Sequence, residues 1–276
     1  MRLAVLWLLA ACSAFDPVSA VPRQYREVDS TRAAIAMILA ENPEPRVYAI
    51  GEYHQTRNAI ASTSPLARFS RDIIGMLEPH AQHLVVEAWL DANCWSSQQL
   101  SHDVAAATGR PAATAMEMMR LVTNARRRGL QTHGLPMTCI EHDAMIDASG
   151  RVDFLLLLEI VTDKLAETTR ALLAHERAVI VYGGALHNDL YPRWPLDELS
   201  YAKPLAHELG GRVLEIDLVV PEVVAPMQMI RSEPWFPLLA QARPDRVIVW
   251  RRGPASYVVI LPSQDAPKLA NLVDVM

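Results

Sequence analysis

Two stretches of the sequence each combine a short apolar run, a glycine and, three residues after that glycine, a histidine. In the first, Gly51 is followed by Glu52 and His54; in the second, Gly184 is followed by His187. Imidazoles titrate near neutral pH, so histidines beside carboxylates suit proton transfer or the binding of a metal ion. We therefore predict that these two stretches, far apart in the chain, form one polar site.

The elements that would position these side chains are short β-strands. Strands are predicted at 46–50, 83–87, 130–133 and 179–182, and they end at Glu52 with His54, at Glu87, at His133 and at His187, in that order. In open α/β sheets, ligands bind beyond the carboxyl ends of the strands. Four successive strand ends that carry a carboxylate or an imidazole therefore predict a common site at one edge of the sheet.

Glu87 directly follows the apolar run 84–86, so it should lie close to buried apolar surface. An ionised carboxylate in that position needs a cation, a metal ion or hydrogen-bond donors. Arg57 is a candidate partner, either in a structural ion pair or as a group that binds a carboxylate or stabilises an oxyanion.

The histidines and one tyrosine allow more than one role. His54 and His187 could act as general base and general acid, could ligate a metal through neutral imidazole, or could cap helices and bond loops. Tyr182 could donate a proton or bind iron, or it could pack in the core. At this point the residues alone leave these roles open.

Several classes of protein are disfavoured. The sequence has no Gly-x-Ser-x-Gly, no His-Glu-x-x-His, no P-loop and no Gly-x-Gly-x-x-Gly after the first predicted strand. These absences count against serine hydrolases, zincins, NTPases and dinucleotide enzymes. The net charge of −5 gives no sign of nucleic-acid binding, which requires clustered lysine and arginine.

Strands alternate with helices through the first 220 residues, which predicts an α/β fold with a mostly parallel central sheet and helices on both faces. Helices are expected at 30–40, 64–77, 111–128 and 153–177, a further strand at 213–220, and loops at 91–109 and 140–150. Strands at 246–250 and 257–261, joined by a turn with Gly253 and Pro254, predict a C-terminal antiparallel hairpin. Residues 24–276 are interpreted as a single domain.

Residues 1–20 are interpreted as an export signal, because a charged tip precedes an apolar run that is too short to span a bilayer. Leu9–Cys12 resembles a lipobox, which would place a lipid anchor on Cys12, whereas Val18–Ala20 suits ordinary cleavage after Ala20. The expected location is the periplasm or the outer membrane as a lipoprotein, otherwise outside the cell. A buried first strand or helix is the alternative.

Export would leave Cys94 and Cys139 as an even pair in an oxidising compartment, where a disulfide is plausible. Two unpaired buried thiols are the alternative reading of the same two residues.

The ordered set of motifs resembles one superfamily, which includes erythromycin esterase-like proteins, ChaN haem-binding lipoproteins and Tiki/TraB proteases. The resemblance covers about residues 45 to 220. It rests on four short motifs: Gly51-Glu52-Tyr53-His54, Gln55-Thr56-Arg57-Asn58, Val86-Glu87 and Gly184-Ala185-Leu186-His187.

The esterase-like members imply hydrolysis, with His54 activating a water while Glu52, Glu87, Arg57 and His187 orient groups and stabilise charge. The Tiki-like members imply that His54, Glu87, His187 and Glu52 hold a divalent metal such as Mn, Co or Zn, which would lower the pKa of a bound water. Both would act on an ester or peptide bond in a small-molecule or peptide substrate.

The ChaN-like members imply a lipoprotein that binds haem or iron through Tyr182 and His187 without catalysis. Two carboxylates beside two imidazoles suit hydrolysis or a metal better than haem. We therefore expect an exported, lipid-anchored hydrolase, with the haem or iron binder as the alternative and an inactive scaffold as a third class.

Overall fold

The computed structural model describes residues 24–57, 62–89, 109–146, 151–174 and 178–264. The predicted export signal with Cys12, the residue Cys94 and most of the predicted loop at 91–109 lie outside these residues.

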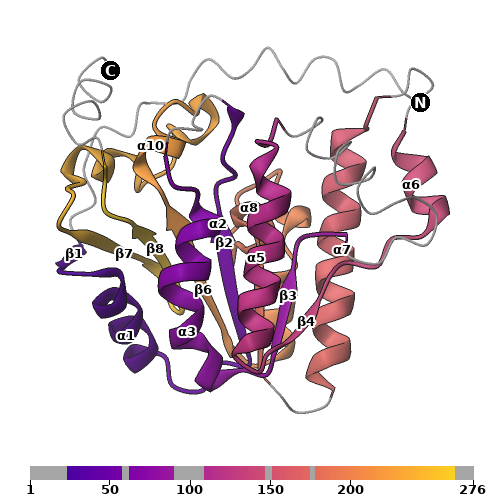
Figure 1. Cartoon of the computed structure of the whole chain (residues 1–276), viewed down its shortest axis with the longest axis horizontal. Coiled ribbons are helices and arrows are strands. Elements are labelled where there is room, and N and C mark those ends of the chain that lie inside the picture. Colours follow the sequence, from indigo (N-terminus) through magenta and orange to yellow (C-terminus); the bar gives the residue numbers. More distant parts are fainter. Residues whose placement is uncertain (1–23, 58–61, 90–108, 147–150, 175–177, 265–276) are drawn as a thin grey trace.

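One mixed sheet runs through the centre of the molecule, with strand order β1-β7-β8-β6-β2-β5-β3-β4 (Figure 1). Its strands are β1 Tyr25–Val28, β2 Val47–Glu52, β3 His83–Val86, β4 Gln131–His133, β5 Val179–Gly184, β6 Val213–Val219, β7 Val247–Gly253 and β8 Ser256–Ile260. The strands from β8 to β4 are all parallel to one another, while β7 is antiparallel to β8 and β1 is antiparallel to β7. The predicted fold class and the C-terminal hairpin are therefore confirmed.

Helices cover both faces of this sheet (Figure 1). The α-helices are α1 Thr31–Glu41, α2 Pro65–Arg68, α3 Ile74–Leu77, α5 Ala113–Arg127, α6 Cys139–Met145, α7 Phe154–Leu173, α8 Ala185–Asn188, α9 Ala202–Glu208 and α10 Pro221–Val224. A π-helical turn, η3 Phe69–Ile73, joins α2 to α3, and the short 3-10 turns are η4 Glu78–His80, η5 Asp197–Leu199, η6 Gln228–Ile230 and η7 Phe236–Gln241. Among these described helices, none is both long enough and apolar enough to cross a membrane.

The central strand β2 is buried on both faces, which explains its unbroken apolar sequence. Tyr48 and Ile50 belong to the core under α1, α2, α3 and α5, whereas Val47 and Ala49 belong to the core under α7 and α9. Because side chains alternate along a strand, the residues that follow are sorted in the same way. Glu52 continues the first face and Gly51 continues the second.

One sequence prediction about local structure is wrong, and one strand is absent from the predicted elements. Part of the predicted loop at 140–150 is the helix α6, because Thr138 and Glu141 form a capping box: the Glu141 N–H donates to Thr138 Oγ1 at 3.2 Å and the Thr138 N–H donates to Glu141 Oε2 at 2.7 Å. Residues 25–28, which the sequence analysis gave no strand, pair with β7 along its outer edge.

Candidate functional site

The ends of β2 and β5 bring a glutamate, a tyrosine and a histidine together. In the parallel register, Ile50 pairs with Tyr182 and Glu52 with Gly184, so Glu52 and Tyr182 project from the same face of adjacent strands. The Tyr182 hydroxyl donates a short hydrogen bond to Glu52 Oε2, and His54 Nδ1 lies 2.8 Å from Glu52 Oε1. Glu52 is 5% exposed, so these donors satisfy a buried carboxylate.

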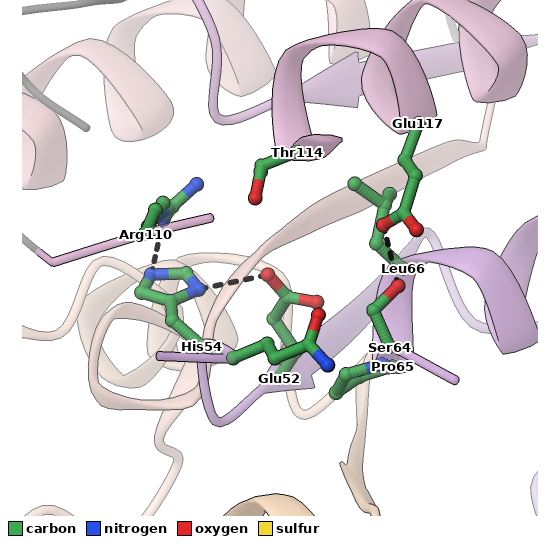
Figure 2. A pocket seen from close by; sticks show the side chains of 9 residues that line it. Glu52, His54, Ser64, Pro65, Leu66, Arg110, Thr114 and Glu117 are labelled. Carbon is green, nitrogen blue, oxygen red and sulfur yellow. Dashed lines mark hydrogen bonds and ion pairs between the residues drawn. The ribbon is translucent and has the colours of Figure 1, made fainter. Parts of the chain in front are cut away.

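The bond to Glu52 also determines which nitrogen of His54 faces outward as a base. A carboxylate only accepts hydrogen bonds, so the proton of a neutral His54 lies on Nδ1 and the lone pair lies on Nε2. Arg110 Nη2 donates a short hydrogen bond to this Nε2 (Figure 2). His54 is therefore oriented like the histidine of a catalytic dyad, with a carboxylate behind it and a basic nitrogen in front.

Glu87 completes a group that we call the strand-end cluster: Glu52, His54, Glu87 and Arg110. Glu87 Oε1 lies 3.1 Å from Arg110 Nη2 and 3.5 Å from His54 Nε2. The backbone N–H of Gly184 donates to its other oxygen, Oε2, at 2.5 Å. The buried carboxylate thus has both the cation and the donors that the sequence analysis required of it.

The cation is not the one that was predicted. The Arg57 side chain is exposed, and the structure does not bring it into the strand-end cluster. Arg110 takes that place from the segment before α5, with a side chain that is 11% exposed. No local signal in the sequence points to Arg110, because it follows no strand and lies far from the two histidine motifs.

His187 lies on α8, directly after β5, and is 2% exposed. Thr162 Oγ1 lies 2.8 Å from its Nδ1, and the same hydroxyl is within 2.8 Å of Leu158 O and 3.1 Å of Leu199 O. His187 Nδ1 also lies 3.3 Å from Leu199 O, and a carbonyl oxygen only accepts, so the proton of a neutral His187 lies on Nδ1, which is shared between Thr162 and Leu199. The Nε2 of His187 keeps its lone pair.

Thr162→Val is expected to weaken this constraint, leaving Leu199 O as the remaining partner of Nδ1, while it preserves the shape of the side chain. We expect histidine ¹⁵N chemical shifts to show that the Nε2–H tautomer of His187 gains population, and any turnover of the wild type to fall by roughly 10-fold, a usual size for loss of such a supporting bond. Thr162→Ser keeps the hydroxyl and should restore both. An unchanged tautomer in the valine variant would contradict this role for Thr162.

Charge interactions set the protonation of the cluster. Burial alone would raise the pKa of Glu87, but attraction to His54, Arg110 and His187 outweighs it and holds this pKa well below its usual range. Burial and Arg110 oppose the charged form of His54, yet Glu87 and Glu52 prevail, so its pKa is raised above 6.5. Burial lowers the pKa of His187. At neutral pH, Glu87 is therefore ionised and His187 is neutral.

A pocket opens in front of His54, with about 210 Å³ of empty space that is partly open to solvent. Figure 2 shows the residues that line it, which are Glu52, His54, Gln55, Ser64, Pro65, Leu66, Arg110, Thr114 and Glu117. Tyr182 and His187 are not among them. In this conformation the enclosed part of the pocket has room for about one water molecule.

In this arrangement, three of the predicted metal ligands contact one another or Arg110. Arg110 Nη2 contacts both His54 Nε2 and Glu87 Oε1, and Glu52 faces the other nitrogen of His54. Within the described part of the chain, no group of three or more His, Cys, Asp or Glu side chains is placed to hold a metal ion. A metal at His54 and Glu87 would require the guanidinium to withdraw.

The predicted haem ligands are also engaged elsewhere. Tyr182 is 1% exposed, its hydroxyl is bonded to Glu52, and its ring stacks on Phe69 with centroids 4.5 Å apart. His187 is held by Thr162 under α7. Neither side chain lines the pocket in front of His54.

The structure does not bring His133 into the site either. Its Nε2 lies 3.1 Å from Nδ1 of His83, the first residue of β3. Three of the four predicted strand ends therefore contribute to the strand-end cluster or lie beside it, and the fourth belongs to a separate histidine pair.

A second polar group, which the sequence does not reveal directly, lies on the opposite face of the sheet from Glu52. Arg252 of β7 bonds Glu215, lies 2.9 Å from Asp189 Oδ1, and approaches Asp217 Oδ2 at 3.9 Å. Glu215 and Asp217 come from the buried strand β6, and Asp189 follows α8 directly. Glu215 and Asp217 are two residues apart in an apolar strand, and this spacing puts both carboxylates on one face. That pattern is the signal in the sequence from which the group could have been predicted.

Fold and site together define a mixed α/β protein with a Glu–His–Arg cluster at the carboxyl ends of its central parallel strands. No family model and no curated protein matches the chain. A solved structure of the type III effector HopBA1 is similar at 15% sequence identity, over 79% of this chain and 88% of that chain, with a TM-score of 0.42.

Proposed function

We propose that this protein is a hydrolase in which His54 activates a water to attack an ester or amide carbonyl. The observation that carries the proposal is the Glu52–His54 pair, which presents Nε2 toward the pocket beside the guanidinium of Arg110. A carboxylate that fixes the tautomer of a histidine and stabilises its charged form is a recurrent device for general-base catalysis. The motifs that resemble erythromycin esterase-like proteins agree with it.

The reaction needs only groups that the cluster supplies. A water replaces Arg110 at Nε2, gives that nitrogen a proton and forms a bond from its oxygen to the carbonyl carbon, while the carbonyl π electrons move onto oxygen. Arg110, still held by Glu87, stabilises the oxyanion. When the oxyanion collapses, the bond to the leaving group breaks and His54 returns its proton to that group.

Water is the better nucleophile here than the serine in the pocket. Ser64 Oγ is 2.5 Å from Glu117 Oε2 and accepts the Ala67 N–H at 3.0 Å as the N-cap of α2. Within the described residues, the proton of this hydroxyl is thus donated to Glu117, and His54 is engaged by Glu52 and Arg110. No acyl-enzyme step is needed.

The test is a screen of ester and peptide libraries with wild-type protein and His54→Ala, with and without chelators. Turnover that survives chelation and is lost in His54→Ala supports the proposed route. Turnover that chelators abolish and Mn, Co or Zn restores, together with stoichiometric metal in wild type by elemental analysis, would favour the metal-dependent route. No turnover on any substrate would contradict the proposal.

The pH dependence of this reaction has a definite sign. His54 must lose its proton to act as a base, so kcat/KM should rise with pH to a plateau. Because Glu87 and Glu52 raise the pKa of His54, the midpoint should lie above 6.5. Glu87→Gln removes the largest attraction that favours imidazolium, so its midpoint should fall. A pH–rate profile of both proteins checks this, and an unchanged midpoint in the variant would contradict it.

We propose that the protein is exported and held at a membrane by a lipid on Cys12, or released after cleavage behind Ala20. One observation supports an oxidising compartment: Cys139, the first residue of α6, is disulfide-bonded. We expect non-reducing peptide mapping of protein from its native compartment to yield a Cys94–Cys139 crosslink that disappears on reduction. A free Cys139 thiol in that sample would count against export.

A further inference from the structure

The pocket in front of His54 has two chemically different sides. Figure 2 shows His54 and Arg110 on one side, Ser64 and Glu117 on the other, and Thr114 between them. The first side belongs to the strand-end cluster and carries the proposed chemistry. The second side is formed by the beginnings of α2 and α5 and takes no part in the reaction as described above.

Glu117 is the charged group of this second side. It is half-buried, and its Oε2 accepts a hydrogen bond of 2.5 Å from Ser64 Oγ. In the described ranges of the chain, no lysine, arginine or histidine forms an ion pair with it. A carboxylate beside low-dielectric protein attracts a cation more strongly than one in bulk water.

The other charges at the pocket are already matched. Arg110 is paired with Glu87, and Glu52 receives hydrogen bonds from His54 and Tyr182. Glu117 is therefore the lining carboxylate whose charge a ligand would complement. Its partner Ser64 satisfies one oxygen with a neutral donor and leaves the charge uncompensated.

We propose that this side of the pocket binds the protonated amine of the substrate, so that the enzyme acts on amine-bearing esters or amides. The inference rests on the proposed function, since it takes the pocket as the place where the substrate binds. The ammonium group lies against Glu117, and the scissile carbonyl lies a few atoms away against His54 and Arg110. The positive and negative ends of the pocket thus orient the substrate.

Binding of two probes of equal size tests this without any need for turnover. We expect n-butylammonium to bind the wild-type protein at least about 10-fold more tightly than 1-butanol, which has the same number of heavy atoms; tenfold corresponds to about 1.4 kcal/mol. Titration followed by calorimetry or ligand-observed NMR gives both constants. Equal binding of the two probes overturns the proposal.

Four variants test which residue causes the preference for n-butylammonium over 1-butanol. Glu117→Gln should abolish it, whereas Glu167→Gln, an equal charge change at a 64% exposed site on α7, should keep it. Ser64→Ala breaks the contact between α2 and α5 but retains the carboxylate, so it should keep the preference for the amine. His54→Gln should keep it as well. A preference that survives Glu117→Gln, or that Glu167→Gln removes, overturns the proposal.

The outcomes also separate this inference from the hydrolase itself. Hydrolysis of neutral esters with no preference for amines overturns the amine site and leaves the hydrolase standing. A Glu117-dependent preference for n-butylammonium without hydrolysis of any ester supports the amine site and counts against the hydrolase. If both hold, Glu117→Gln should raise KM for amine-bearing esters about 10-fold and leave kcat nearly unchanged, because Glu117 is remote from the reacting atoms.

Discussion

His54→Gln is expected to lower kcat/KM by about two to four orders of magnitude, the usual contribution of a positioned general base. The glutamine amide can still donate to Glu52, so the carboxylate stays satisfied while the basic nitrogen is lost. Steady-state kinetics on the best substrate from the library screen measure the loss, and circular dichroism confirms that the variant is folded.

His80→Gln is the matched control for this change. His80 is exposed in η4, at the amino edge of the sheet before β3, so the same substitution there should leave kcat/KM unchanged. A His54→Gln protein that retains wild-type turnover would show that the Glu52–His54 pair is only structural.

Gly51→Ala is expected to lower the free energy of unfolding by about 3 kcal/mol or more, at the upper end of the usual cost of overpacking. A Cβ at this position would overlap Asp217 Oδ1 and would lie 2.9 Å from the backbone Cα of Ala185. Neither neighbour can easily retreat, because Asp217 lies on the buried strand β6 and Ala185 begins α8. Urea denaturation measures the change, and failure to fold would be its extreme form.

Gly75→Ala provides the contrast. A Cβ there would meet only Nη1 and the guanidinium of Arg128, at 2.6 Å, and that exposed side chain can swing away. Since alanine favours helix by up to about 1 kcal/mol over glycine, this variant should be neutral or slightly more stable. Equal unfolding free energies for the Gly51→Ala and wild-type proteins would show that the strand end tolerates a side chain.

The sequence predicts the core of the site because of one geometric rule. Parallel strands share an edge, so motifs that follow β2, β3 and β5 must meet, and Glu52, His54 and Glu87 do so. His133 follows the same rule in sequence but not in space, because its ring turns to His83. Whether a residue after a strand points into the site depends on local geometry that periodicity does not reveal.

The arginine of the strand-end cluster shows why proximity in sequence is a poor guide to contacts in the folded protein. Proximity in sequence to His54 makes Arg57 the expected partner, but its side chain is exposed to solvent. Arg110 is separated from His54 by α2, α3 and β3 and from Glu87 by residues 88–109, and only the packed structure brings it between the two side chains. Similarly, the four residues of β1 are recognisable as a strand only through their pairing with β7.

Arg252 of the C-terminal hairpin forms ion pairs with Asp189, in the segment that follows α8, and with Glu215 of β6. The Tyr191 hydroxyl adds a hydrogen bond of 2.8 Å to the Pro254 carbonyl in the hairpin turn. A chimera that exchanged this hairpin for that of another protein would have to bring an arginine at the same register, or replace the acidic residues it meets. In protein engineering, the C-terminal strands therefore cannot be exchanged without regard to these ion pairs.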